Sequence, residues 1–170
     1  MTTKVSGNLI GSIPDDLRPE LVLVAASLVD QQPVGLDTPL QVSFGPAQGT
    51  VSDPVALAAD GTTTIQQDRT YRGTATFSLS RSTSIGEAIL WVRLLVDGVQ
   101  QGVPFSLLMT DDDMTIPLQF FFEADFVAGQ ILNMEIYRDS NGINNGGLTT
   151  QSSSIGWGTA PSAHLRMTSF

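Results

Sequence analysis

The sequence predicts an all-β protein, a sandwich or jelly roll of about eight short strands. Three observations lead to this class. Apolar and polar residues alternate with a period of two through most of the chain after residue 40. Tight-turn dipeptides such as Asp60-Gly61 and Asp97-Gly98 interrupt the alternation. The candidate strands also follow one another at roughly even spacing, which is typical of all-β folds.

Length and composition exclude several classes of function. A chain of 170 residues suits one compact domain. Its formal net charge of −9 repels nucleic-acid phosphates and anionic membrane surfaces, so neither partner is expected. Cysteine is absent, which excludes disulfides, thiolate zinc sites and cysteine nucleophiles. The first residues lack the basic and apolar regions of a secretory signal, so we expect a protein made in the cytoplasm of its host without a signal peptide.

Residues 1–38 differ from the rest of the chain. A short amphipathic helix is indicated by four apolar residues at helical spacing, Leu17, Leu21, Val24 and Leu28. Residues 21–24 are all apolar, however, and fit a buried strand equally well. Pro33, Gly35 and Pro39 then interrupt any regular structure. We therefore expect an N-terminal arm over residues 1–38 and a jelly-roll domain over residues 39–170.

The strands of that domain are expected, in chain order, at residues 41–45, 55–59, 71–79, 88–96, 99–108, 114–122, 131–138 and 162–170. Residues 71–79 show the cleanest alternation, with Arg, Thr and Ser between apolar or small residues. This pattern predicts a half-buried strand with one face in water.

The strand expected at residues 88–96 is apolar on both faces except for Arg93. A strand in a two-layer sandwich needs only one apolar face, so another element must cover the second. Phe120, Phe121 and Phe122 raise the same question. Burial within one chain and burial against a second subunit both explain these patterns.

Few residues in the sequence could carry catalysis. His164 is the only histidine and lies in the last expected strand, where a surface or interface role is more common than acid–base chemistry. No G-x-S-x-G motif presents a serine nucleophile, and no glycine-rich loop followed by lysine could bind phosphates. The acidic candidates for glycoside hydrolysis are not paired by any pattern; they are Glu87, Glu123, Asp125 and Glu135. We expect no catalytic residue, no cofactor and no enzyme activity.

Two loops carry weak candidates for calcium ligands. In the acidic turn at residues 111–113, side chains alternate in direction, so Asp111 and Asp113 could converge on a cation. Asp139 and Asn141 begin a loop rich in Asn and Gly, which lacks the carboxylate spacing of an EF-hand. Solvated turns explain both loops without a metal, because Asn and Gly favour left-handed backbone conformations.

Several segments, taken in order, resemble the C1q/TNF-like jelly rolls of phage structural proteins. Residues 91–100, WVRLLVDGVQ, look like the strand–turn–strand in which these domains carry R-x-L-V-N-G. Residues 135–148 look like their penultimate strand and its long exit loop, and residues 160–166 look like their closing strand. Further similarity lies at residues 39–45, 60–62 and 71–77.

This resemblance implies a homotrimer with no catalytic residues. It also implies aromatic residues along the threefold axis, for which the candidates are Trp91, Phe121, Tyr137 and Phe170. The expected role is a bacteriophage virion protein on the particle surface, a capsid decoration or head-fibre subunit. Its N-terminal arm, residues 1–38, would dock on the major capsid protein or another virion protein. The alternative is a fibre knob that recognises a host surface glycan or protein through the loops at residues 111–113 and 139–147.

Overall fold

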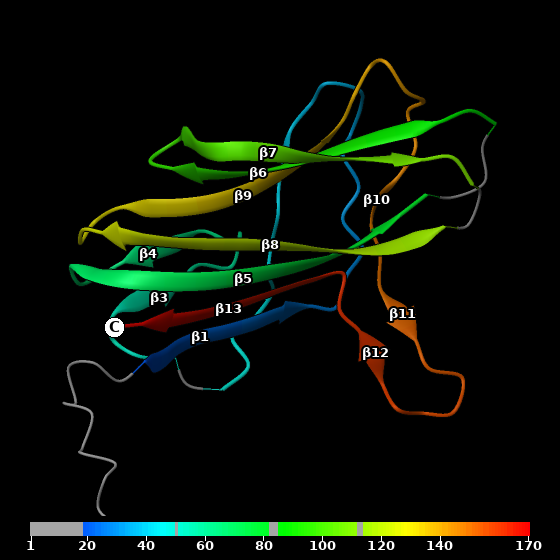
Figure 1. Ribbon diagram of the computed structural model, residues 1–170. Helices are drawn as coiled ribbons and strands as arrows, with labels where there is room; N and C mark the ends of the chain where they lie inside the picture. Colours follow the sequence, from blue (N-terminus) through cyan, green and yellow to red (C-terminus); the bar gives the residue numbers. More distant parts are fainter. Residues whose placement is uncertain (1–18, 50, 82–84, 112–113) are drawn as a thin grey trace, which may run out of the picture.

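The computed structural model describes residues 19–49, 51–81, 85–111 and 114–170, and these residues form strands, turns and loops without any helix. None of the described residues therefore belongs to a helix long and apolar enough to cross a membrane. Two antiparallel sheets and a separate two-stranded hairpin make up the chain (Figure 1).

The first sheet, which we name sheet A, has β5 at its centre. β5 (Arg69–Ser80) pairs with β13 (Ala163–Ser169) on one side and with β8 (Thr115–Phe126) on the other. β1 (Glu20–Ser27) pairs with β13, and the short β10 (Gly147–Leu148) pairs with the end of β5. Because β8 pairs with β5 alone, β8 is an edge strand.

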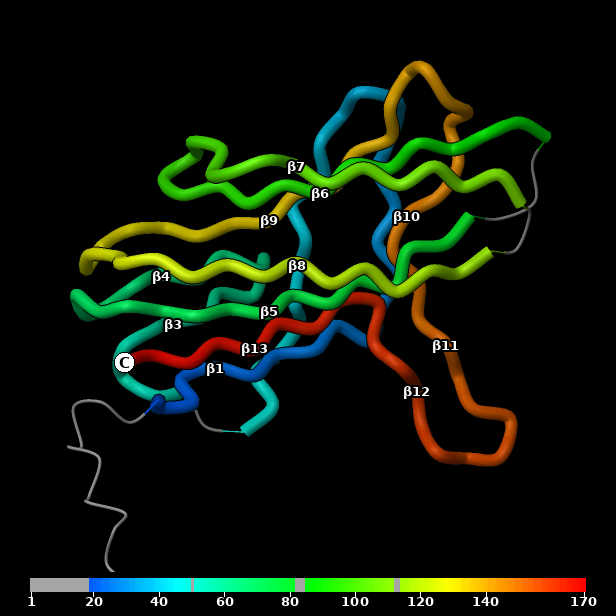
Figure 2. The backbone as a smooth tube through the Cα atoms, viewed as in Figure 1, coloured from blue at the N-terminus to red at the C-terminus, as the bar shows by residue number. Residues whose placement is uncertain are grey.

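The second sheet, sheet B, is built around β9 (Ile131–Arg138) and β6 (Ala88–Val96). β7 (Val99–Met109) pairs with β6 alone and forms an edge, while β4 (Thr63–Ile65) and β2 (Leu40–Gln41) pair with β9. β3 (Val55–Leu57) closes the far side against β4. The hairpin of β11 (Gln151–Ser152) and β12 (Thr159–Ala160) extends away from both sheets (Figures 1 and 2).

The long strands confirm the all-β prediction, and β6 and β9 have the predicted bounds. The predicted helix is wrong for residues 20–27, which form β1, while Leu17 lies outside the described residues. Pairing along β13 decides the conformation of this segment. A β-bulge between Leu21 and Leu23 breaks the alternation, so neighbouring Val22 and Leu23 are both buried. The boundary between residues 38 and 39 stays a prediction, although β1 is part of sheet A.

The strand predicted at residues 41–45 is regular only at Leu40–Gln41. β4, β10, β11 and β12 were not predicted, since strands of two or three residues are too short to show a period.

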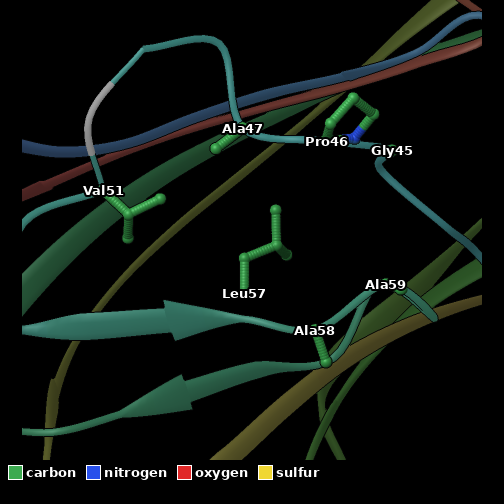
Figure 3. Close-up of a pocket in the computed structure, with 7 residues that line it drawn as sticks. All are labelled: Gly45, Pro46, Ala47, Val51, Leu57, Ala58 and Ala59. Atoms are coloured by element: carbon green, nitrogen blue, oxygen red, sulfur yellow. The ribbon is translucent and has the colours of Figure 1, made fainter.

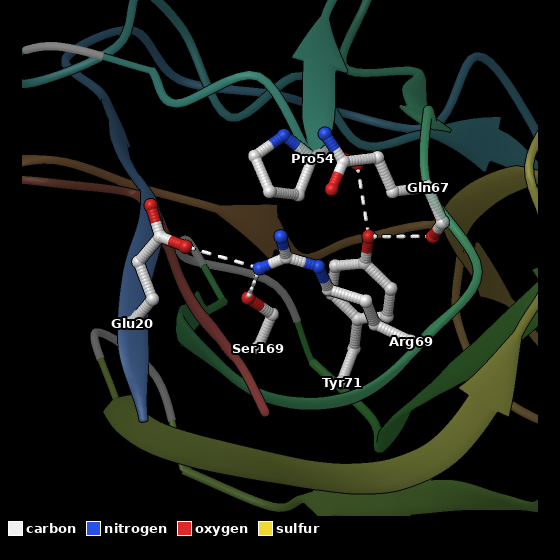
Figure 4. A network of polar contacts seen from close by, with 6 residues as sticks. All are labelled: Glu20, Pro54, Gln67, Arg69, Tyr71 and Ser169. Carbon is white, nitrogen blue, oxygen red and sulfur yellow. Dashed lines mark hydrogen bonds and ion pairs between the residues drawn. The ribbon is translucent and has the colours of Figure 1, made fainter. Parts of the chain in front are cut away.

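Tyr71 anchors the core from the middle of sheet A. Its side chain is fully buried. The carbonyl oxygens of Pro54 and Gln67, at 3.0 and 2.9 Å, share the single hydrogen that its hydroxyl donates (Figure 4). Burial raises the pKa of the Tyr71 phenol. In the same view Arg69 bonds both Glu20 of β1 and the Ser169 hydroxyl of β13, so three strands are tied together there.

A buried polar network joins the two sheets. Gln31 is 9% exposed, and its amide nitrogen donates to the Ser43 carbonyl and to the hydroxyls of Ser27 and Ser162. Nearby, the guanidinium of Arg138, 8% exposed, donates to three neutral oxygens. These acceptors belong to Gln32, Asn144 and Gly146. Burial lowers the pKa of Arg138.

Gly73 is required where β5 passes under an aromatic ring. Its cross-strand partner in β8 is Phe122, and a Cβ atom on Gly73 would lie 2.0 Å from the Cζ atom of that ring. The absence of a side chain therefore lets Phe122 pack over β5 and reach Phe126, whose ring centroid is 6.3 Å away.

We expect Gly73→Ala to lower the free energy of unfolding by about 1–3 kcal/mol, because Phe122 must move out of a packed site. Urea unfolding measures this change. The matched control is Thr74→Ala, at the next position on the partly exposed face of β5. Equal unfolding free energies for the two variants would contradict this account of the Phe122 packing.

Candidate functional site

The two edge strands, β7 and β8, face each other across an open apolar groove. Phe105 of β7 meets Phe120 of β8 edge to face, with ring centroids 5.4 Å apart. The groove has a volume of about 520 Å³, and Gly102, Val103, Phe105, Phe120, Phe121 and Phe122 are among its lining residues. Val103 is 81% exposed, Phe121 66% and Phe105 47%. Apolar side chains gathered at this exposure are typical of a surface that a partner covers.

The backbone of both edges discourages growth of the sheets. Each edge strand contains a proline, Pro104 in β7 and Pro117 in β8, which removes a donor from the ladder. The pairing of β6 with β7 also shifts register between Val92 and Leu94, and Gly102 has a φ of 67°. A partner is therefore expected to pack against side chains at this edge and not to add a strand.

The outer face of sheet A is mostly polar. Arg72 pairs with Glu123 of β8 at 2.7 Å, and its guanidinium lies 5.2 Å from the centroid of the Phe170 ring. Phe121 lies opposite Thr74, two residue pairs further along the same two strands and therefore on the same face. His164 is also partly exposed on β13, and burial together with the charge of Arg166 lowers its pKa.

The outer face of sheet B carries an aromatic pair. Trp91 of β6 lies directly opposite Tyr137 of β9, with ring planes 4° apart and centroids separated by 6.2 Å. The indole nitrogen of Trp91 donates a hydrogen bond of 2.8 Å to Asp139. The pKa of Tyr137 is raised by burial and then by the negative charges of Asp139 and Asp37.

An ion pair lies next to the aromatic pair on this face. Arg93 bonds one carboxylate oxygen of Glu135 through Nε and Nη2, at 2.8 and 2.6 Å. Both residues are the next outward-facing positions along β6 and β9 and are partly exposed.

The four aromatic residues predicted to line a subunit interface therefore lie on two faces. Phe121 and Phe170 are on the outer face of sheet A, and Trp91 and Tyr137 are on the outer face of sheet B. Sequence reasoning missed Val103 and Phe105, because β7 is largely exposed on both faces and shows no alternation of burial.

The calcium candidates are not brought together among the described residues. Asp113 lies outside them, and Asp111 is exposed. Asp139 accepts hydrogen bonds from the Asn141 backbone and side chain on one oxygen and from Trp91 on the other. These bonds lower the pKa of Asp139, the backbone bond most of all. In the parts of the chain that the structure describes, no three His, Asp or Glu side chains are placed to hold a metal.

Two further apolar features were not predicted. The tip of the β11–β12 hairpin exposes Ile155 by 70% and Trp157 by 87%. Their signal in the sequence is the glycine-flanked IGWG within an uncharged stretch. Elsewhere a shallow apolar hollow is lined by Gly45, Pro46, Ala47, Val51, Leu57, Ala58 and Ala59 (Figure 3).

Comparison with known proteins shows the fold. No protein-family model and no curated protein matches the sequence. The structure is similar to that of Eiger TNF from S. frugiperda, with a TM-score of 0.56 and 12% identity over 90% of this chain and 94% of that one. The globular domain of zebrafish complement 1qA protein aligns over 89% of this chain and 96% of that one, with 10% identity and a TM-score of 0.48. The similarity to the TNF structure confirms the predicted jelly-roll fold of the C1q/TNF-like class.

We expect acid to release the Trp91 indole. Hydrogen bonds hold the pKa of Asp139 in the folded protein below its ordinary value of 3.8. The carboxylate therefore keeps its bond to Trp91 above pH 3.8, and the bond is lost as the pH falls through the folded-state pKa. In a Trp157→Phe background Trp91 is the sole tryptophan, so its fluorescence should change with a midpoint below pH 3.8. Circular dichroism must show that the fold persists there. A change that survives in Asp139→Asn would contradict the assignment.

Proposed function

We propose that this chain is a trimeric, non-enzymatic structural subunit of a bacteriophage particle, a capsid decoration or head-fibre protein. The apolar edge formed by β7 and β8 carries the proposal, since it exposes Val103, Phe105 and Phe121 to water in a single chain. The TNF-like jelly roll and the resemblance of residues 40–170 to phage jelly rolls support it.

In a ring of three copies, the β7–β8 edge of every copy would be buried against a neighbour, and no such edge would stay exposed. In such a ring each copy offers the edge to a different surface of its neighbour, and threefold rotation closes the contact. Phe121 belongs to the edge and also points to the polar outer face of sheet A, on which Phe170 lies two strands away beside Arg72, so that face is the surface proposed to receive the neighbour's edge. The prolines of β7 and β8 favour packing of side chains over continuous sheet formation.

Docking on the particle is proposed for residues 1–38, and within them for the residues that precede β1, because β1 itself is part of sheet A. The major capsid protein or another virion protein is the proposed partner. Three arms on one rigid trimer would bind together, so weak single contacts would add up to firm attachment. Re-binding of the purified protein to capsids stripped of it tests this part.

We expect Phe121→Asp to convert the trimer to a monomer at micromolar concentration, because it places a charge in an apolar contact. Light scattering after size exclusion should give about three times 18.1 kDa for the unaltered protein and 18.1 kDa for the variant. Ile155→Asp is the matched control, an equally exposed apolar residue away from the edge, and it should stay trimeric. A monomeric unaltered protein would overturn the proposal.

The second candidate function is recognition of a host surface by a fibre knob, favoured by the exposed tip of the β11–β12 hairpin. Exposed tryptophans on projecting loops often dominate binding energy at an interface. For this function Trp157→Ala should weaken binding of the trimer to host cells about tenfold or more in a sedimentation assay. Unchanged cell binding together with re-binding to stripped capsids would favour decoration.

A further inference from the structure

The outer face of sheet B combines aromatic rings and hydrogen-bonding groups in one row. Trp91 and Tyr137 are partly exposed, and their rings lie nearly parallel as a stacked pair. The indole is held in place by its bond to Asp139, whose own position is fixed by Asn141. Such a rigid aromatic surface can bind a ligand without first losing side-chain freedom.

We propose that this face binds a neutral glycan through a hexopyranose ring stacked on Trp91 and Tyr137. A pyranose presents an apolar face of C–H groups and a rim of hydroxyls. The electron-rich face of an aromatic ring attracts the slightly positive C–H groups, and contact removes apolar area on both sides from water.

Polar groups for the hydroxyl rim lie on both sides of the rings. Along the strands, the Arg93–Glu135 pair uses only one carboxylate oxygen of Glu135, and in the described part of the chain neither the other oxygen nor Nη1 of Arg93 has a hydrogen-bond partner. Across the sheet, exposed Ser106 of β7 lies directly opposite Trp91 and can donate or accept. An acceptor, a charged donor and a hydroxyl therefore surround the aromatic pair.

The charges on this face select against acidic sugars. Asp37 and Asp139 lie close enough to Tyr137 to raise its pKa, and Glu135 adjoins it, whereas Arg93 is the single cation of the group. The chain as a whole carries a formal charge of −9. A sialylated or sulfated glycan would be repelled, so the ligand is a neutral one.

This proposal deepens the second candidate, recognition of a surface, and rests on it for biological purpose. It does not depend on the trimer, because the site lies within one chain, on β6, β7 and β9. Loss of glycan binding and loss of trimerisation or of cell binding through the hairpin are therefore separate observations.

The test is titration of the full-length Trp157→Phe protein, in whatever oligomeric state it adopts, with neutral tetrasaccharides of glucose, mannose, galactose and N-acetylglucosamine. Because Trp91 is then the sole tryptophan, stacking should alter its emission on addition of at least one sugar, and calorimetry should give the affinity. Trp91→Ala and Tyr137→Ala should each weaken binding about tenfold or more, and Glu135→Gln should weaken it less. Ile155→Ala, an exposed residue off this face, should have no effect.

Several results would overturn the site. They are absence of binding by every neutral sugar at millimolar concentration, equal binding by Trp91→Ala, or tighter binding of sialylated or quaternary ammonium probes, which would indicate a different ligand class. Dissociation of the trimer by Trp91→Ala would also overturn it, since Trp91 would then belong to a subunit contact. Circular dichroism confirms that each variant is folded before its binding is scored.

Discussion

The two-layer arrangement depends on the buried charge of Arg138, which is paired with no carboxylate in the part of the chain that the structure describes. Among the described residues, Arg138 donates hydrogen bonds to the side-chain amide oxygen of Gln32 in the crossing segment, to that of Asn144 in the loop after β9 and to the backbone carbonyl of Gly146. Because a guanidinium loses much of its hydration at this position, each of these neutral oxygens must be in place. The network thereby fixes residues 31–37, which run between the sheets, and the loop that leads from β9 to β10.

With residues 31–37 and the β9–β10 loop held in place by this network, the outer faces of the two sheets carry different kinds of side chain. Sheet A faces outward with Thr, Ser and charged side chains, and its edge meets that of sheet B in the Phe105–Phe120 contact. Sheet B faces outward with the Trp91–Tyr137 pair. The apolar run in β6 is thus divided: Leu90, Val92 and Leu94 fill the core, and Trp91 lies outside with its indole nitrogen bonded. One face of this strand therefore serves folding, and the other carries the aromatic pair proposed for recognition.

How far the sequence predicted this structure depends on the length of each element. Long strands such as β5 and β9 show their period over many residues, and the turn residues of Asp97-Gly98 mark the β6–β7 hairpin, where both have positive φ. β1 was ambiguous because its bulge places two apolar residues side by side in the core. The buried roles of Gln31 and Arg138 could not be predicted, since each depends on a partner more than a hundred residues away in the sequence. The edge residues Val103 and Phe105 were missed because the exposure of β7 is set by its position at the end of the sheet.

The position of the aromatic pair connects the two proposed surfaces. Trp91 is one strand away from the β7 edge, and Ser106 lies between it and the groove, so burial of the groove by a neighbouring copy would leave the outer face of sheet B open. Three such faces on one ring would point away from the shared axis and could engage a multivalent surface together. A shallow site of this kind binds weakly by itself, since a flat face encloses little of a sugar. Trimerisation would then supply the avidity that a single Trp91–Tyr137 pair lacks, because the second and third contacts form at high effective concentration.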